Sequence, residues 1–418
     1  MSSAPTIPHQ ARVSADAKPG GGLQGVYLAT CGPCYAALDA DPIDAARIVD
    51  SIAAEREFAA LVLRESEVLG ETSRAGAPVL SVLVSSYEAE AFMAECLEDL
   101  FAQENAPETE VIVVDAASPQ DERSVVERFR RWHDNIVYVR TPERIGIYPA
   151  WNVALHLAAG RYVVPMSTND RLGPAAHAQL AARLDEYHDV ALVYGDSYVT
   201  KIAHERFADH AQRTGDLPSF SWPDYDFVDL LFNCRVGPHP MWRRDVHRSV
   251  GYFDGRYAAI GDQDFWLRLG RDHKLWHLAV PTGLAWISEN SLSARGESML
   301  EVLSIQHKHQ EAYRKYGAQL GSFPGQRSQP SVRQDADELF GRAQTALRLN
   351  RPQELSVLLA EVLRIDPGHE GAWRVVRAFR EVQEQTLQVR LRDPLAMEKD
   401  QSPMAMRDAP SSAEPRSR

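Results

Sequence analysis

The sequence predicts an α/β fold in which a mostly parallel, mixed sheet is covered by helices on both faces. Short apolar runs alternate with amphipathic helices from Val79 onward, as crossover connections between parallel strands require. The apolar runs are nearly continuous, which is typical of strands buried on both faces. Polar residues follow successive strands, and ligands of open α/β sheets bind at that edge. The sequence therefore predicts a polar ligand there.

The N-terminal part divides into two segments. Residues 1–22 are rich in Ser, Ala, Pro and Gly without an apolar period, which predicts disorder. Residues 23–75 are expected to form a helical segment, because apolar residues recur at helical spacing between Ile43 and Leu69. The turn-rich link ETSRAGAP then leads into the α/β part.

The central domain is expected to cover residues 79–320. Its first strand is VLSVLVSS, and the helix that follows places Phe92, Cys96, Leu97 and Phe101 on one face. The later strands are expected in the segments EVIVVD, IVYVRT, RYVVPMS and DVALVYGDSYV. The helices between them are expected in SVVERFRRW, PAWNVALHLAAG and PAAHAQLAARLDEY.

The chain is helical again over residues 335–384. The segments DELFGRAQTALRLN, PQELSVLLAEVLRIDP and GHEGAWRVVRAFREV resemble a tetratricopeptide hairpin with a third helix. One such repeat cannot bury its own apolar face, so it must pack on the main domain or on a protein partner. Residues 385–418 are dominated by charge, Ser and Pro, which predicts a disordered tail.

Composition restricts the class of protein. Of the 418 residues, 44% are hydrophobic and 25% charged, as in globular proteins, and the net charge is −13. An acidic chain is not expected to bind nucleic acid. The sequence contains neither an apolar stretch long enough to span a bilayer nor a signal peptide. The expected location is the cytoplasm, including the inner face of the membrane, and four cysteines fit a reducing compartment.

A set of ordered motifs resembles the family 2 glycosyltransferases, which have the GT-A nucleotide-binding fold. The motifs are PVLSVLVSSYEAEAFMAECLEDLFAQ, EVIVVDAAS, ERIGIYPAWNVALHLAAGRYVVPMSTNDRLGP and GPHPMWRRDVHRSVGYFDGRYAAIGDQDFWLRLGRDHKLWHL. They cover about 240 residues in the family's order and spacing. The resemblance implies transfer of a sugar from a nucleoside diphosphate sugar to an acceptor hydroxyl with inversion.

The nucleotide contacts that the resemblance implies follow the first strands. Asp115 would accept a hydrogen bond from a uracil-type imide, Tyr87 would stack on the base, and Ser86 would contact it. As alternatives, Asp115 caps the next helix and Tyr87 is a core aromatic. Arg144 would meet the diphosphate, since a guanidinium suits phosphate oxygens, or it is a solvated loop residue.

The chain departs from the family at two of these positions. Ala116 replaces the second acid after the second strand, which weakens the expectation about the base. Asn152 matches the family's asparagine and is assigned to the nucleotide, but Trp151 stands before it where relatives often have an arginine.

The metal site departs further from the family pattern. The D-x-D-D stretch becomes Ser-Thr-Asn169-Asp170, with one carboxylate in place of two or three. Magnesium often takes only one or two protein carboxylates, with phosphate and water completing its shell. Asp170 with Asn169 is therefore expected to hold Mg²⁺ or Mn²⁺ bound to the nucleotide. The alternative is that Asp170 caps a helix and binds no metal.

Asp262, in GDQDFWLRL, stands where the family has its catalytic base. Transfer with inversion needs a carboxylate within reach of the acceptor hydroxyl as it attacks the anomeric carbon. Asp264 is the competing acid, which either faces the acceptor or caps the helix. His239 and Trp242 are assigned to the acceptor site, because aromatic faces suit sugar rings, or they belong to the core.

The leading hypothesis is an inverting glycosyltransferase that builds cell-surface or secreted polysaccharide on a glycan or lipid-linked acceptor, with the C-terminal helices binding a protein partner. The second is a catalytically degenerate scaffold that binds nucleotide or glycan. A nucleotidyltransferase lacks the expected Gly-rich phosphate loop. A redox role for the Cys31-Gly-Pro-Cys34 tetrad is disfavoured, because the flanking residues cannot supply a thioredoxin sheet.

Overall fold

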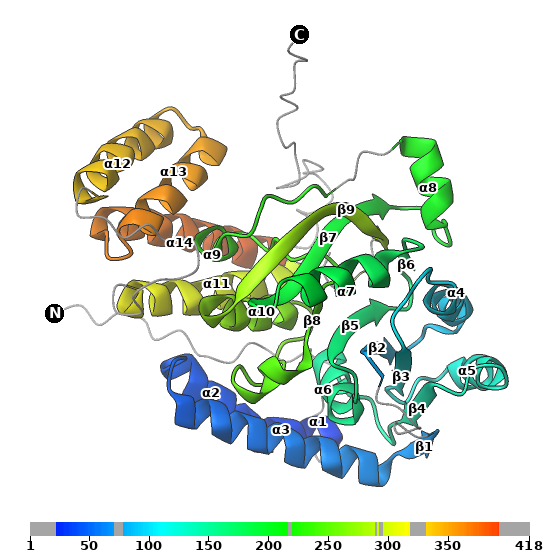
Figure 1. Ribbon diagram of the computed structural model, residues 1–418. Helices are drawn as coiled ribbons and strands as arrows, with labels where there is room; N and C mark the ends of the chain where they lie inside the picture. Colours follow the sequence, from blue (N-terminus) through cyan, green and yellow to red (C-terminus); the bar gives the residue numbers. More distant parts are fainter. Residues whose placement is uncertain are drawn as a thin grey trace.

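The fold is a nine-stranded mixed sheet with helices on both faces (Figure 1). It is described from a computed structural model that covers residues 22–70, 78–215, 220–288, 291, 296–317 and 332–392. The strand order is β1-β4-β3-β2-β5-β8-β7-β9-β6. The α/β class and the mostly parallel, mixed sheet expected from the sequence are confirmed. Disorder was predicted for residues 1–22 and 385–418. Residues 1–21 and 393–418 lie outside the described residues, as does most of the link ETSRAGAP, and the prediction is wrong for residues 385–392, which belong to a helix.

The first half of the sheet consists of four parallel strands joined by helices. The strands are β2 (Leu80–Ser86), β3 (Thr109–Asp115), β4 (Ile136–Arg140) and β5 (Tyr162–Ser167). The helices are α4 (Glu90–Phe101), α5 (Glu122–Arg130) and α6 (Ile147–Leu157). These bounds agree with the sequence prediction to within two residues for the strands, because long β-branched runs favour the pleated, buried conformation.

The strand order reverses beside β2. The chain moves outward from β2 to β3 and β4, and then returns to place β5 on the other side of β2. Two crossover connections therefore diverge between β2 and β5. That reversal is where ligands of open α/β sheets bind.

The second half of the sheet is mixed. Its strands are β6 (Arg171–Leu172), β7 (Val190–Thr200), β8 (Met241–Arg243) and β9 (Lys274–Trp286). Strand β8 pairs antiparallel with both β5 and β7 and so joins the two halves. The helical elements here are α7 (Ala176–Glu186), α8 (Phe207–Thr214), α9 (Phe227–Leu230), the short 3₁₀ helix η1 (Arg244–Arg248) and α10 (Gly261–Asp272).

Alternating side chains of the strands supply two hydrophobic cores. Val82 and Val84 of β2 pack with α4 and α7 on one face, whereas Leu83 packs with α6 on the other. The core on the α6 face of the sheet is the larger of the two, because the N-terminal and C-terminal helices also contribute side chains to it. Strands buried on both faces explain the nearly continuous apolar runs in the sequence.

The N-terminal segment is more structured than the sequence suggested. Helices α1 (Leu23–Thr30) and α2 (Gly32–Ala40) precede the expected helix, which is α3 (Ala45–Glu65), and β1 (Glu67–Leu69) adds an edge strand to β4. These helices lie along α6 at the bottom of Figure 1. Helices α1 and α2 lack a clear apolar period in the sequence, because Gly and Pro interrupt them.

The C-terminal helices pack on the central domain. They are α11 (Gly296–Tyr316), α12 (Val332–Arg348), α13 (Pro352–Ile365) and α14 (Glu370–Arg392), which continues past the expected boundary at residue 384. Arg364 of α13 forms an ion pair with Asp226, 2.9 Å away. Trp373 of α14 is buried against Tyr313 of α11, whereas Val357 and Val382 remain exposed. That these helices form a tetratricopeptide repeat and bind a partner stays a prediction.

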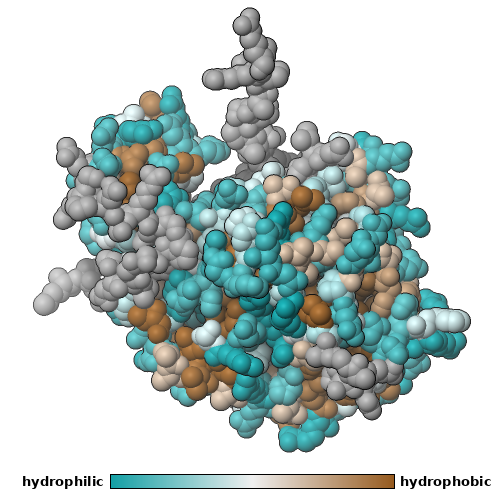
Figure 2. Space-filling model, in the orientation of Figure 1, coloured by the Kyte–Doolittle hydropathy of each residue, from teal (hydrophilic) through white to brown (hydrophobic). Residues whose placement is uncertain are grey.

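The surface viewed in Figure 2 is mostly hydrophilic, with apolar residues scattered between polar ones. Within the described ranges, none of the helices has the combination of length and apolar character that crossing a membrane demands.

The four cysteines are all free. Cys31 is buried between α1 and α2, and burial raises the pKa of its thiol well above the usual value. Burial also raises the pKa of Cys34. A redox-active pair needs a stabilised thiolate, so this tetrad lacks the electrostatics of a thioredoxin site.

Candidate active site

The carboxyl edge of the sheet carries most of the residues assigned to the nucleotide. Ser86 ends β2 and is paired in register with Asp115 at the end of β3, which in turn is paired with Arg140 at the end of β4. Ser85 is paired with Ser167, just before Asn169 and Asp170. The structure therefore brings Ser86, Tyr87, Asp115 and the Asn169-Asp170 pair to the same edge.

Asp115 is fully buried beneath this edge and has three partners. One carboxylate oxygen accepts a hydrogen bond from the backbone N–H of Ser118 at 2.8 Å. The other accepts from the Tyr138 hydroxyl at 2.5 Å and forms an ion pair with Arg140. The alternative of a helix cap is wrong, because Asp121 caps α5. Asp115 instead fixes the β3–α5 turn.

Tyr87 and Arg144 are the more accessible residues at the carboxyl ends of β2 to β5, the part of the sheet named the nucleotide edge because the predicted nucleotide contacts lie there. The guanidinium carbon of Arg144 lies 4.0 Å from the centre of the half-buried Tyr87 ring, a cation–π stack. Arg144 is exposed in the loop between β4 and α6. The stack provides a flat cationic surface that suits a base or a diphosphate. Ser86 contributes less, because it is buried and its hydroxyl lies 3.5 Å from Glu122.

Arg140 and Tyr138 were missed by the sequence analysis. Both contact Asp115 from the neighbouring strand β4, whereas the sequence predicted a role only for Arg144 in the following loop. The signal was available, because Arg140 ends an otherwise apolar strand directly beside the strand that ends in Asp115.

Asn152 is not at this edge. Its amide nitrogen donates to Glu55 at 2.9 Å and to the Phe253 carbonyl at 2.8 Å, and its oxygen accepts from the Phe253 N–H. The side chain is buried and all three contacts lie within the fold. Asn152 therefore ties α6 to α3 and to the loop before α10.

Glu55 is the buried acid of this cluster. The Tyr27 hydroxyl donates to it at 2.5 Å and accepts from the Gly255 N–H. Burial raises the pKa of Glu55 from 4.5 to about 8, although Tyr27, Tyr35 and Asn152 oppose the shift by hydrogen bonding to the carboxylate. Nearby Asp254 adds to the rise.

We expect this acid to make the fold less stable as the pH rises. Between pH 4.5 and about 8 the folded chain holds a proton on Glu55 that the unfolded chain has released. Stability therefore falls with increasing pH across this window, by up to about 1.4 kcal/mol per pH unit. Glu55→Gln stays neutral at every pH. The difference between its melting temperature and that of wild type should therefore shift in favour of the variant as the pH rises from 5 to 8.

Differential scanning fluorimetry across this range measures the effect. Glu57→Gln on the exposed side of the same helix is the matched control and should track wild type at every pH. A constant difference between Glu55→Gln and wild type would contradict the proposed neutral acid.

Asp170 lies between β5 and β6 next to His239. One carboxylate oxygen accepts the backbone N–H of Trp286 at 3.0 Å, and the other lies 3.4 Å from Nε2 of His239. The alternative that Asp170 caps a helix is wrong, since β6 follows it directly and α7 begins at Ala176. Asp170 is thus a bridge between the β5 end and β9.

His239 is buried against Gly283. A Cβ atom at Gly283 would lie 2.3 Å from Nδ1 of His239, so only glycine leaves room for the ring. Neither ring nitrogen of this 2% exposed side chain has a hydrogen-bond partner in the described structure. Its polar neighbour is Asp170, whose carboxylate lies 3.4 Å from Nε2.

The residues around Asp170 can hold a divalent metal only together with a ligand. Among the described residues no three His, Cys, Asp or Glu side chains gather as a complete metal site. Asp170 would supply one carboxylate, Asn169 an amide oxygen, and His239, 3.4 Å from Asp170, an imidazole. This set fits Mg²⁺ or Mn²⁺ whose remaining ligands are phosphate oxygens and water.

Asp262 lies in the first turn of α10 and faces the start of α6. Its carboxylate accepts the Tyr148 hydroxyl at 3.2 Å and the backbone N–H of Gln263 at 2.9 Å. Burial raises the pKa of Asp262 to about 6, and these two hydrogen bonds limit the rise. Because α6 follows β4, its first turn lies at the carboxyl edge, and Asp262 lies there with it.

The backbone before Asp262 is held by Glu301 of α11. The carboxylate of Glu301 accepts the N–H groups of Ala258, Ala259 and Ile260 at 2.7 to 3.0 Å. At Gly261 a Cβ atom would lie 2.8 Å from the Tyr148 ring, so glycine permits the close approach of α10 to α6. Asp262 is therefore positioned from two sides.

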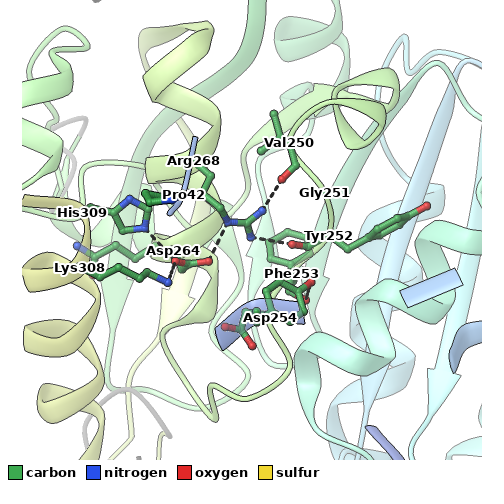
Figure 3. A network of polar contacts seen from close by, with 12 residues as sticks. Pro42, Val250, Gly251, Tyr252, Phe253, Asp254, Asp264, Arg268, Lys308 and His309 are labelled. Atoms are coloured by element: carbon green, nitrogen blue, oxygen red, sulfur yellow. Dashed lines mark hydrogen bonds and ion pairs between the residues drawn. The ribbon is translucent and has the colours of Figure 1, made fainter. Parts of the chain in front are cut away.

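Asp264 belongs to a buried network of charged side chains (Figure 3). It is 1% exposed and lies 2.5 Å from Nζ of Lys308, 2.9 Å from His309 and 3.0 Å from Arg268. Burial opposes its ionisation, but Lys308 and Arg268 outweigh that effect and hold the pKa of Asp264 well below its usual value. Burial lowers the pKa of His309 to about 4.

Arg268 and Lys308 extend this network to other elements. Arg268 donates to the carbonyls of Val250 and Tyr252, and Lys308 also pairs with Asp39 of α2 at 2.9 Å. Asp264 thus joins α10 to α2 and α11. Trp242 is likewise inside the fold, fully buried with its indole N–H donated to His247 at 3.0 Å. Of the three predicted acceptor residues, only His239 lies beside other site residues.

Comparison with known proteins identifies relatives of the central domain. The model of the family described as glycosyl transferase family 2 matches residues 81–250. A PGL/p-HBAD biosynthesis glycosyltransferase of Mycobacterium tuberculosis is 24% identical over 195 residues, which are 46% of this chain and 70% of the relative. The poly(ribitol-phosphate) β-N-acetylglucosaminyltransferase TarS of Staphylococcus aureus is 33% identical over 116 residues, 27% of this chain and 20% of TarS.

A solved structure also resembles the chain. It is TarS of S. aureus, residues 1–349, in complex with UDP-GlcNAc. The TM-score is 0.45 at 18% identity, over 68% of this chain and 90% of that one.

Proposed function

We propose that this chain, whose residues 81–250 match the model of glycosyl transferase family 2, transfers a sugar from a nucleoside diphosphate sugar to an acceptor hydroxyl with inversion. The chain is a glycosyltransferase, as the family match and the named relatives support. The observation that best supports the proposed mechanism is Asp262, an acid with a pKa of about 6 held at the carboxyl edge of the sheet.

Asp262 acts as the general base in this mechanism. The acceptor oxygen attacks the anomeric carbon while its proton passes to the Asp262 carboxylate. The bond between that carbon and the diphosphate breaks, and its electron pair leaves with the diphosphate. A pKa near 6 leaves Asp262 ionised at neutral pH yet more basic than an ordinary aspartate, which favours proton transfer.

The donor is bound along the rest of the edge. The Tyr87–Arg144 stack is proposed to receive the base and diphosphate, because it is the accessible cationic surface next to β2 and β4. Asp170 and Asn169, with His239 beside them, would hold Mg²⁺ or Mn²⁺, which would offset the negative charge of the departing diphosphate. Asp115 supports the site from below through Ser118 and Arg140.

The acceptor is proposed to be a cell-surface or secreted glycan or its lipid-linked precursor. The names of several relatives support this class: PGL/p-HBAD biosynthesis, teichuronic acid biosynthesis and poly(ribitol-phosphate) glycosylation. Kinship at the level of the domain does not by itself fix a substrate.

The pH profile of turnover should report Asp262. Protonation removes the base, so kcat/KM is expected to fall about tenfold per pH unit below pH 6 and to be flat above 7. Tyr148→Phe removes a hydrogen bond that lowers the pKa of Asp262, and should move the acidic limb to higher pH. A profile that is flat down to pH 4.5, or the same in both proteins, would argue against this assignment.

The proposed function is tested by titrating the protein calorimetrically with UDP and GDP, with and without Mn²⁺. The nucleotide that binds then selects the donor sugars, whose turnover is followed as release of that nucleotide. The expected result is metal-dependent binding of one nucleotide and measurable turnover. Failure of both nucleotides to bind under any condition would reject the proposal.

The alternative of a binding scaffold has one observation in its favour. Asp115 is fully buried and all its contacts are internal, so the recognition that the family places there is altered. The same experiment separates the two functions, because a scaffold would bind a nucleotide or its sugar and never release the nucleotide from the donor.

A further inference from the structure

A cavity lies at the opposite edge of the sheet from the candidate active site. It has a volume of about 670 Å³ and is bounded by the residues that precede β2 and β5 and by those that follow β8. This volume is within the range of small-molecule sites. Its walls are formed by Arg56, Pro78, Val79, Leu155, Ala159, Arg161, Arg243, Arg244, Asp245, His247, Arg248 and Tyr252.

The charge of this pocket is opposite to that of the protein. Five of its lining residues are arginines and one is an acid, although the chain as a whole has a net charge of −13. His247 adds no charge at neutral pH, because burial lowers its pKa to about 3. Gathering five guanidinium groups costs electrostatic free energy unless an anion lies among them.

Two of the arginines are already held in place. Arg243 donates through Nε to the Val190 carbonyl at 2.8 Å and through Nη2 to the Leu184 and Tyr187 carbonyls. Arg244 donates through Nε to the Gly160 carbonyl at 2.6 Å and through Nη2 to that of Ala159 at 3.3 Å. In the described structure Nη1 of each has no protein acceptor. A rigid guanidinium with a free nitrogen loses little entropy on binding an anion.

The rim arginines are freer. Arg161 forms an ion pair with Asp185 and lies over the ring of Tyr162. Arg56 on α3 and Arg248 on η1 are exposed, and neither has an ion-pair partner among the described residues. Guanidinium hydrogen-bond donors therefore line the pocket from the N-terminal helices and from both halves of the sheet.

We propose that this pocket binds the phosphoryl group of an anionic ligand, separately from the nucleotide edge. A phosphoryl group matches the arrangement because its several oxygens can accept from guanidinium groups on different sides. The ligand is either the headgroup of an anionic phospholipid or a soluble phosphate ester, and both share this chemistry. The proposal does not depend on the sugar-transfer mechanism, since the pocket and the edge share no residue.

The test uses the full chain and two matched variants. Arg56→Ser/Arg248→Ser removes the two unpaired rim charges and leaves Arg243 and Arg244 in place. The control is Arg128→Ser, an exposed arginine of α5 without an ion pair in the described structure. One arm measures co-sedimentation with phosphatidylcholine vesicles, with and without phosphatidylglycerol. The other arm titrates inorganic pyrophosphate calorimetrically.

The double variant is expected to bind its preferred probe roughly thirtyfold more weakly than wild type, about fivefold per arginine, while the control binds normally. Vesicle binding that requires phosphatidylglycerol assigns the headgroup, and pyrophosphate binding without vesicle binding assigns a soluble phosphate ester. All three proteins have the same nucleotide edge, so a difference between them reports the pocket. If the double variant matches the control in both arms, with unchanged melting temperatures, the proposal is wrong.

Discussion

Asp262→Asn is expected to lower the turnover of the donor sugar by about 10²- to 10⁴-fold. The change removes the proton acceptor and keeps the size of the side chain and its contact with Tyr148. Because the hydrogen-bond partners of Asp262 are Tyr148 and Gln263, and the Tyr87–Arg144 stack does not involve it, the affinity for the nucleotide should stay within about twofold.

Steady-state kinetics with nucleotide release as the readout, together with calorimetric titration, measures both quantities. Asp272→Asn at the exposed end of the same helix is the control and should be as active as wild type. Turnover that survives in Asp262→Asn would exclude this residue as the base. An equal loss in nucleotide affinity would instead indicate a disturbed fold.

Asp170→Asn should weaken metal-dependent nucleotide binding by at least about 10- to 100-fold. Losses of roughly that size follow the mutation of residues that only support a metal ligand, and Asp170 is proposed to be a ligand itself. Asparagine keeps an oxygen that can accept the Trp286 N–H, so the link to β9 is retained while the charge is lost. This makes the variant a sharper probe than alanine, which removes both.

The measurement is a calorimetric titration with nucleotide in the presence and absence of Mn²⁺. We expect the affinity without metal to be the same in both proteins and only the gain caused by Mn²⁺ to disappear. If Mn²⁺ strengthens binding equally in wild type and Asp170→Asn, Asp170 is not a ligand of the nucleotide-bound metal.

The sheet could be predicted from the sequence because the signals for its strands and helices lie within short segments of the chain. Strands such as Leu80–Ser86 and Thr109–Asp115 are runs of β-branched residues of the right length, and each is followed by an amphipathic helix. Their carboxyl ends meet at one edge in any parallel arrangement. Hence Ser86, Tyr87, Asp115 and Asp170 could be assigned to that edge before the structure was known.

The remaining site residues depend on contacts between distant segments. Asn152 lies on a helix next to the edge, but the hydrogen bonds that turn it inward come from Glu55 and Phe253. Asp264 and Asp262 are two residues apart, yet Lys308 and His309 of α11 bind only the former. Trp242 is buried by aromatic neighbours from α10. A single sequence carries no local signal for such pairings.

The Asp264 network bears on the order in which the chain can mature during synthesis. Asp264 is made together with Arg268 but before Lys308 and His309. A carboxylate at such a depth is destabilising when part of its cationic surroundings is missing, so we expect α10 to dock fully only after α11 has been synthesised. Until then we expect the apolar face of α10 to stay open to chaperones, although the four parallel strands are already complete.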